Sequence, residues 1–124
     1  MTPPLVLLIE DEPLILMDVE VALQDAGFEV VTAGNAAKAI TIFEKRSATI
    51  CAVVTDIRLG KGDSGWDVGR HVREAVPTMP VVYMSGDSSG EWTAQGVPNS
   101  IMIAKPFAFP QLITAISTLL NEVK

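Results

Sequence analysis

The chain has 124 residues, of which 48% are hydrophobic and 19% charged, and its formal net charge is −6. This length and apolar content suit one compact domain with a buried core, and they argue against a disordered chain. Nine lysines and arginines are scattered along an acidic sequence, which argues against direct binding to nucleic acid.

The sequence shows no pattern typical of export or membrane insertion. The amino-terminal stretch MTPPLVLLIEDEP lacks a basic region, and carboxylates follow its short apolar run at once. No apolar run approaches the length of about 18 residues that a membrane-spanning helix needs. The single cysteine, Cys51, suits a reducing compartment, and its place at the start of an apolar run predicts a buried, inert thiol. We therefore expect a cytoplasmic protein that does not contact the membrane.

Five apolar runs of strand length are spread along the chain. They cover residues 4–10, 28–33, 50–56, 79–85 and 100–104. Most of them show no polar alternation, which is typical of strands that are buried on both faces. Because helical patterns separate the runs, the strands are predicted to lie parallel in one doubly wound α/β domain.

Helical patterns fill the connections between these runs. Four are clear: residues 13–26, a helix from Asn35 to about residue 46, a helix that Asp63 or Ser64 caps, and a last helix from about Phe109. The connection over residues 86–99 contains three glycines and a proline. A short or irregular fourth helix, of about two turns, is therefore expected there.

Polar residues stand at the carboxyl ends of four predicted strands, where parallel sheets bind their ligands. They are Glu10 and Asp11 after the first strand, Asp56 after the third, Ser85 after the fourth and Lys105 after the fifth. Each alone is ordinary, because acid pairs cap helices and single polar residues end strands in turns. If these four strands are neighbours, however, all five side chains meet at one edge of the sheet.

The residue types at this edge suit the formation of an aspartyl phosphate. Three carboxylates in one pocket repel each other, and a hard divalent cation such as Mg²⁺ relieves that repulsion. Lys105 offers a compact positive charge and Ser85 a hydroxyl for phosphoryl oxygens. An aspartate can serve as the nucleophile of such a reaction.

Four stretches, VLLIEDEP, VVTDIRL, YMSGD and IAKPF, resemble the receiver domains of two-component response regulators in their order and spacing. The resemblance covers essentially the whole chain and implies a flavodoxin-like sheet of order 2-1-3-4-5 with five helices. It implies a single receiver domain over residues 1–124 without an output domain, which is a signalling module and not an enzyme acting on a separate substrate. Such a domain takes a phosphoryl group from a phosphohistidine of a sensor histidine kinase or histidine phosphotransfer protein, and thereby switches its binding to a downstream protein target.

The resemblance also implies roles for individual residues. Those that would hold Mg²⁺, the one cofactor implied, are Glu10, Asp11, Asp56 and the backbone carbonyl of Arg58. Asp56 would be phosphorylated, and Ser85 and Lys105 would bind the phosphoryl oxygens, with a cis peptide before Pro106. Ser85 and Met102 would form the switch pair, although Met102 stands where an aromatic residue is usual and has no hydroxyl.

Other interpretations of the same residues are weaker. A phosphate-independent interaction module would keep the fold without the chemistry, and Met102 slightly favours it. A phosphatase of the haloacid dehalogenase type needs a second aspartate two residues after the nucleophile, where this chain has Arg58. Gly60, Gly62 and Gly65 match the G-x-G-x-x-G pattern of dinucleotide sites, but the first of them does not stand at the strand end.

A few side chains outside this edge invite interpretation. Trp66 is expected in the core, His71 in solvent and Trp92 partly exposed. The helix over residues 13–26 is apolar nearly all round, with Leu14, Leu16, Met17 and Val21 in excess of one face. In the receiver family this helix belongs to the kinase-docking surface, so we expect a partner-binding patch there.

Overall fold

The computed structural model describes residues 2–86 and 89–122 of the chain. Its strands are β1 (Leu5–Ile9), β2 (Glu29–Ala33), β3 (Ile50–Asp56), β4 (Val81–Ser85) and β5 (Ile101–Ala104). Its helices are α1 (Pro13–Asp25), α2 (Ala36–Arg46), α3 (Gly65–Ala75), α4 (Trp92–Gln95) and α5 (Phe109–Glu122), with a 3₁₀ turn η1 (Ser89–Glu91) before α4. The predicted alternation of strand and helix is confirmed.

The strands form one parallel sheet in the order β2-β1-β3-β4-β5. This is the flavodoxin-like order that the resemblance to receiver domains implies. The register pairs Ile9 with Thr55 and Ser85 with Ala104, so β1 and β3 end side by side, as do β4 and β5. The polar residues that follow these strands therefore share one edge of the sheet.

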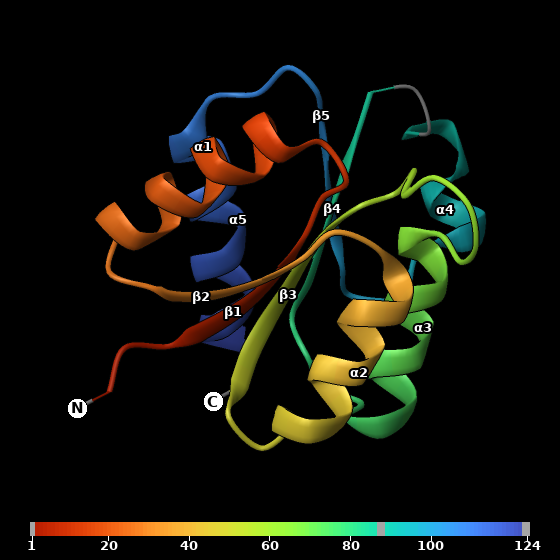
Figure 1. The fold of residues 1–124 in the computed structure, drawn as a ribbon, viewed down its shortest axis with the longest axis horizontal. Coiled ribbons are helices and arrows are strands. Elements are labelled where there is room, and N and C mark those ends of the chain that lie inside the picture. Colours follow the sequence, from red (N-terminus) through yellow and green to blue (C-terminus); the bar gives the residue numbers. More distant parts are fainter. Residues whose placement is uncertain (1, 87–88, 123–124) are drawn as a thin grey trace.

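Helices cover both faces of the sheet (Figure 1). Helices α1 and α5 lie on one face, and α2 and α3 lie on the other. Each face has its own apolar cluster, with Leu23 and Leu112 on the α1/α5 side and Phe43 and Trp66 on the α2/α3 side. Burying apolar surface contributes roughly 25 cal/mol per Å² to folding, so these two layers supply the main stabilisation of the domain. The expected core position of Trp66 is confirmed.

Local signals fix where the helices begin. The side chain of Asn35 accepts a hydrogen bond from the Lys38 backbone N–H at 2.8 Å and caps α2. Ser64 caps α3 in a capping box with Asp67, in which each side chain accepts from the backbone N–H of the other residue. Pro13 opens α1, as expected for a residue without a backbone N–H.

The fourth helix is short, as the glycines of its segment predict. Helix α4 has four residues, and none of them is buried. The chain behind it is anchored at Val97, whose N–H donates to the Tyr83 hydroxyl at 3.2 Å. Arg73 holds the same turn through the backbone carbonyls of Pro98 and Asn99. Residues 87–88 of the predicted segment lie outside the described part of the chain.

One expectation about side-chain burial is wrong, and another holds only in part. Cys51 is exposed rather than buried. The pairing of β1 with β3 slips at this point, with Leu5 opposite Ile50 and Val6 opposite Ala52, so Cys51 is the unpaired extra residue of an irregular register. The side chain of His71 is 35% exposed, because it lies 3.4 Å from Glu44 and its ring packs against that of Phe43 in a T-shaped arrangement.

Among the described residues, no helix combines the length and the apolar character needed to cross a lipid bilayer.

Candidate functional site

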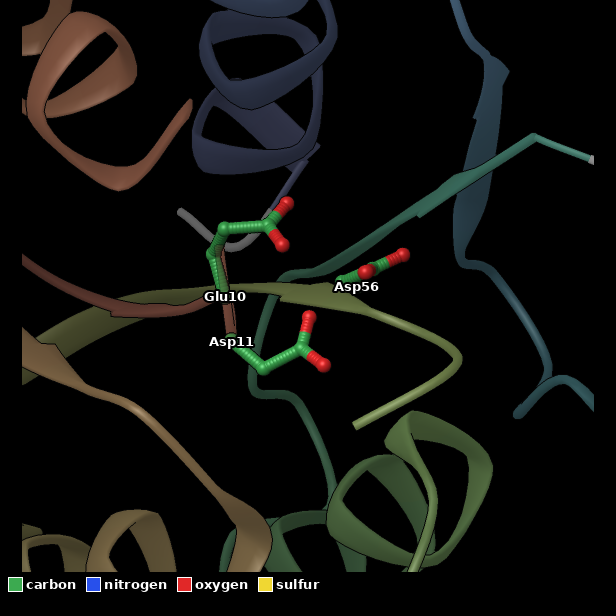
Figure 2. Close-up of side chains that lie close together, drawn as sticks. All are labelled: Glu10, Asp11 and Asp56. Carbon is green, nitrogen blue, oxygen red and sulfur yellow. The ribbon is translucent and has the colours of Figure 1, made fainter. Parts of the chain in front are cut away.

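Three carboxylates converge at the carboxyl edge of the sheet. Glu10 and Asp11 follow β1, and Asp56 ends β3. Oxygen atoms of all three side chains lie within 4.8 Å of one another. In Figure 2 the side chains of Glu10 and Asp11 both extend toward the side on which Asp56 lies. The convergence predicted from strand ends alone is confirmed.

Lys105 adds a positive charge to this cluster. Its Nζ lies 2.9 Å from Glu10 Oε1 and 3.4 Å from Asp56 Oδ2. The backbone N–H of Lys105 donates to the carbonyl of Ser85 at 2.7 Å, which ties the end of β5 to the end of β4. The peptide before Pro106 is cis, as expected. Ser85 itself is buried beside the same edge.

Glu10 is fully buried, and both of its carboxylate oxygens are occupied. Oε1 accepts from Lys105, and Oε2 accepts from the backbone N–H of Glu12 at 3.1 Å. A buried charge is costly unless it is paired and hydrogen-bonded, and Glu10 meets both conditions. Its side chain is therefore held in one orientation, with Lys105 drawn toward it.

The electrostatics of the cluster show an excess of negative charge. Burial, and then the charge of Glu10, raise the pKa of Asp56 to about 6, although Lys105 and the Ile57 N–H oppose the shift. Burial and the hydrogen bond and charge of Glu10 also raise the pKa of Asp11. Burial alone would lower the pKa of Lys105, but its contacts with Glu10 and Asp56 outweigh burial and raise it.

This donor set fits a hard divalent cation. Carboxylate oxygens are among the ligands that Mg²⁺ takes in proteins, and a cation near Asp11 and Asp56 would oppose the burial and the Glu10 charge that raise their pKa values. The acidic cluster can therefore hold a metal ion. Arg58 lies in the loop beyond Asp56 and lines a groove of about 560 Å³ together with Asp11 and Trp66.

The loop after Asp56 closes tightly on the site. Gly60 has φ +78°, and a Cβ there would lie 3.9 Å from Asp11 Oδ2. At the end of the loop, a Cβ on Gly65 would lie 2.1 Å from the backbone oxygen of Asp56, so only glycine fits. The G-x-G-x-x-G spacing thus reflects loop shape beside an acidic cluster, which would repel a pyrophosphate.

Met102 lies inside β5 and does not reach the carboxyl edge. It pairs with Tyr83 of β4 and packs, partly buried, against the α2/α3-side core cluster. Ser85 stands two residues beyond Tyr83, at the strand end. The two residues of the expected switch pair therefore lie on neighbouring strands, with Met102 nearer the core.

The expected patch on α1 is largely present. Leu14 is 77% exposed, Met17 61% and Val21 53%. Leu16 does not belong to it, because it packs against the α1/α5-side core cluster. Phe109, which the sequence analysis did not assign to the patch, is 42% exposed and lines a groove of about 680 Å³ between α1 and α5. The position of Phe109 at the start of a helix does not indicate in the sequence that it lies near α1.

Comparisons with known proteins agree on one family. The family model of the response regulator receiver domain matches residues 6–117. A response regulator receiver protein from Sinorhizobium medicae is 47% identical, with 98% of each chain covered and a TM-score of 0.95. The receiver domain of sensor histidine kinase PA1611 from Pseudomonas aeruginosa, crystallised with a magnesium ion coordinated in its active site cleft, has a TM-score of 0.82 at 23% identity and covers 96% of this chain.

Curated relatives include larger regulators. The alginate biosynthesis transcriptional regulatory protein AlgB of Pseudomonas syringae pv. tomato is 37% identical over 84 residues, which are 68% of this chain and 18% of AlgB. This chain spans from about a fifth to about half of the length of the curated regulators that it matches. With the family model covering most of its length, the chain belongs to the response regulator receiver domains of two-component signalling.

Proposed function

We propose that this chain accepts a phosphoryl group on Asp56 from a phosphohistidine of a sensor histidine kinase or histidine phosphotransfer protein. The observation that carries the proposal is the placement of Asp56 among two further carboxylates and Lys105, at the carboxyl edge of a receiver fold. A buried carboxylate can act as the nucleophile toward a phosphoryl group, and the neighbouring lysine can compensate the negative charge of that group.

The acceptor has suitable protonation for this step. A pKa of about 6 leaves the Asp56 carboxylate ionised at pH 7.5. A carboxylate oxygen attacks phosphorus, and the oxygen–phosphorus bond forms as the phosphorus–nitrogen bond of the phosphohistidine breaks. The imidazole nitrogen keeps the electron pair of that bond and takes up a proton. Later attack of water on phosphorus releases inorganic phosphate and restores the carboxylate.

Each neighbouring residue has a role in this proposal. Lys105 leaves its intermediate position between Glu10 and Asp56 to contact a phosphoryl oxygen, and the Ser85 hydroxyl donates to another. Asp11, Asp56 and the backbone carbonyl of Arg58 would hold Mg²⁺, with Glu10 acting through water. When bound, Mg²⁺ supplies positive charge for the transferring phosphoryl oxygens. The receiver domain of PA1611 was crystallised with a magnesium ion in its active site cleft, which supports Mg²⁺ as the cation proposed here.

The exposed apolar residues of α1 provide a surface for the phosphodonor protein. Leu14, Met17 and Val21 lie on the helix that directly follows the acid pair. A partner that packs against them is placed next to Asp56. Phosphorylation would then switch the binding of a downstream protein target. Ser85 and Met102 lie on the two strands that would respond. We propose that this phosphotransfer takes place in the cytoplasm. We propose one receiver domain over residues 1–124 that acts through such partners.

Acetyl phosphate provides a direct test. Incubation of the protein with Mg²⁺ and acetyl phosphate should raise its intact mass by one phosphoryl group. Asp56→Asn, or replacement of Mg²⁺ by EDTA, should abolish the increase. Asp63→Asn, which changes an exposed aspartate of the same loop, is the matched control and should retain it. No uptake from acetyl phosphate or from any histidine kinase of the same cell would support a phosphate-independent interaction module instead.

A further inference from the structure

A chain of polar contacts runs along α3 from the loop after Asp56 to the short helix α4. The backbone N–H and the hydroxyl of Ser64 donate to Asp67 Oδ2 at 2.8 and 3.1 Å. Arg70 Nη2 donates to the other carboxylate oxygen of Asp67 at 2.9 Å. Arg70 Nη1 donates to the backbone carbonyl and the side-chain oxygen of Gln95, at 3.1 and 3.2 Å. One guanidinium thus joins two elements that lie side by side in Figure 1.

The first end of this chain of contacts is attached to the phosphoryl acceptor. Asp56 Oδ1 accepts from the Ile57 N–H at 2.9 Å, and the Ile57 carbonyl accepts from the Gly65 N–H at 2.8 Å. The absence of a side chain on Gly65 lets the first turn of α3 rest directly on the backbone of Asp56. A change at the Asp56 carboxylate therefore acts on the residues that cap α3.

The second end is attached to a helix in which no residue is fully buried. Helix α4 has four residues with none buried, and a helix of this length does not hold its position by its own hydrogen bonds. Apolar packing normally fixes a surface helix, but Trp92, the one large apolar side chain of α4, is 36% exposed, so polar contacts contribute to the placement of α4. Two such contacts are those of Arg70 with Gln95 and of the Trp92 indole N–H with Ser100 Oγ at 2.9 Å.

We propose that Arg70 is a positioning residue that couples the phosphorylation state of Asp56 to the position of α4. The inference rests on the proposed function, because it requires Asp56 to change state. A substituent on the Asp56 carboxylate alters its bond with Ile57, the loop over residues 57–64 adjusts at its glycines, and the Ser64–Asp67 cap moves Arg70. Arg70 then shifts or releases Gln95. This route runs along the surface of α3 and not through the core. Met102, which packs against the core, has no hydroxyl that could pair with Ser85.

The two tryptophans allow both ends of the route to be observed in one spectrum. Trp66 is buried at the start of α3 and lines the groove beside Asp11, whereas the Trp92 indole N–H reports on α4. Protein labelled with ¹⁵N-tryptophan gives one indole cross-peak for each, and Trp92→Phe assigns them. Beryllofluoride with Mg²⁺ serves as the mimic of the phosphorylated aspartate.

Addition of beryllofluoride and Mg²⁺ should displace both indole cross-peaks in the native sequence. In Arg70→Ala the Trp66 cross-peak should still move, but the displacement of the Trp92 cross-peak should fall below half of its native value. Arg70→Lys keeps the charge without the planar fork and should give an intermediate displacement. Gln95→Ala removes only the side-chain acceptor and should give a smaller reduction than Arg70→Ala.

Different results would contradict the inference alone and the proposed function with it. Equal displacement of the Trp92 cross-peak in the native sequence and in Arg70→Ala would overturn the inference, as would a Trp92 cross-peak that never moves while that of Trp66 does. If neither cross-peak moves in the native sequence, the proposed function fails together with the inference. Arg46→Ala, the same change at an exposed position of α2, is the matched control. An unchanged Trp66 cross-peak before the addition shows that each variant is folded.

Discussion

The ionised carboxylate of Asp56 costs folding free energy at neutral pH. Burial and the charge of Glu10 raise its pKa to about 6, so folding opposes its ionisation. The group therefore contributes its full stability only below the ordinary pKa of an aspartate, and that stability is lost as the pH rises through about 6. At neutral pH the folded protein would be more stable if the Asp56 carboxyl group were neutral than it is with the group ionised.

Removal of the Asp56 charge should therefore stabilise the folded protein. Without Mg²⁺ at pH 7.5, Asp56→Asn should increase the free energy of unfolding by about 1–3 kcal/mol, because the substitution removes the buried charge. The difference should shrink as the pH falls from about 6 toward 4, since the native carboxylate then becomes protonated. Urea unfolding of both proteins across this range measures it. A less stable variant at pH 7.5 would mean that the pair with Lys105 dominates.

Mg²⁺ provides the control for that measurement. Saturating Mg²⁺ should stabilise the native protein more than Asp56→Asn, because the variant has lost one of the three carboxylates that can hold the ion. Equal stabilisation of the two proteins would remove Asp56 from the set of metal ligands.

The exposed thiol of Cys51 gives a second residue-scale prediction. The slip in the pairing of β1 and β3 leaves Cys51 unpaired and exposed. The folded protein should therefore react with one equivalent of a disulfide reagent such as DTNB without denaturant. Reaction only after unfolding would show that the thiol is buried, as the sequence pattern suggested. Cys51→Ser should abolish the reaction and leave phosphoryl uptake unchanged.

At the scale of the elements, the proposed function assigns partner docking to α1 and phosphoryl acceptance to the acid cluster. Its exposed side, Leu14, Met17 and Val21, faces away from the core, whereas Val19 and Leu23 are buried. Under this proposal a small phosphodonor reaches Asp56 without contact with α1, whereas a protein donor packs against it. Substitutions on the exposed side should therefore affect the two donors differently.

The third prediction uses that difference. Met17→Glu should slow phosphotransfer from a histidine kinase that phosphorylates the native chain by about tenfold, the effect of roughly 1.4 kcal/mol. Its rate with acetyl phosphate should stay within about twofold, because the acid cluster is unchanged. Gln24→Glu, at another exposed position of the same helix, is the matched control and should behave like the native chain. Equal losses with both donors would place the damage in the fold rather than in docking.

Elements with strong periodic or capping signals could be predicted from the sequence, and irregular pairings could not. Pro13, Asn35 and Ser64 mark the starts of three helices because each satisfies or removes an orphan N–H. The burial of Cys51 was predicted wrongly, because a register slip between two strands depends on tertiary pairing. The position of Phe109 beside α1 likewise depends on how two helices distant in sequence pack.

At the scale of the whole molecule, the strand order explains why the site was accessible to sequence analysis. Glu10, Asp56 and Lys105 stand at or directly after strand ends, and parallel topology puts those ends at one edge of the sheet. The strand order that brings them together was implied by the family resemblance. The contacts within the site were less predictable. Nothing in the sequence shows that Lys105 lies closer to Glu10 than to Asp56, because that choice depends on side-chain burial and competing charges.

The central claim is that Asp56, and no other carboxylate of the cluster, becomes phosphorylated. Treatment with acetyl phosphate and Mg²⁺, followed by borohydride reduction, converts an aspartyl phosphate into homoserine, which peptide mass spectrometry locates. We predict homoserine at position 56 and unmodified Glu10 and Asp11. Homoserine at position 11, or no conversion at position 56 in a sample whose intact mass has increased, would contradict the account.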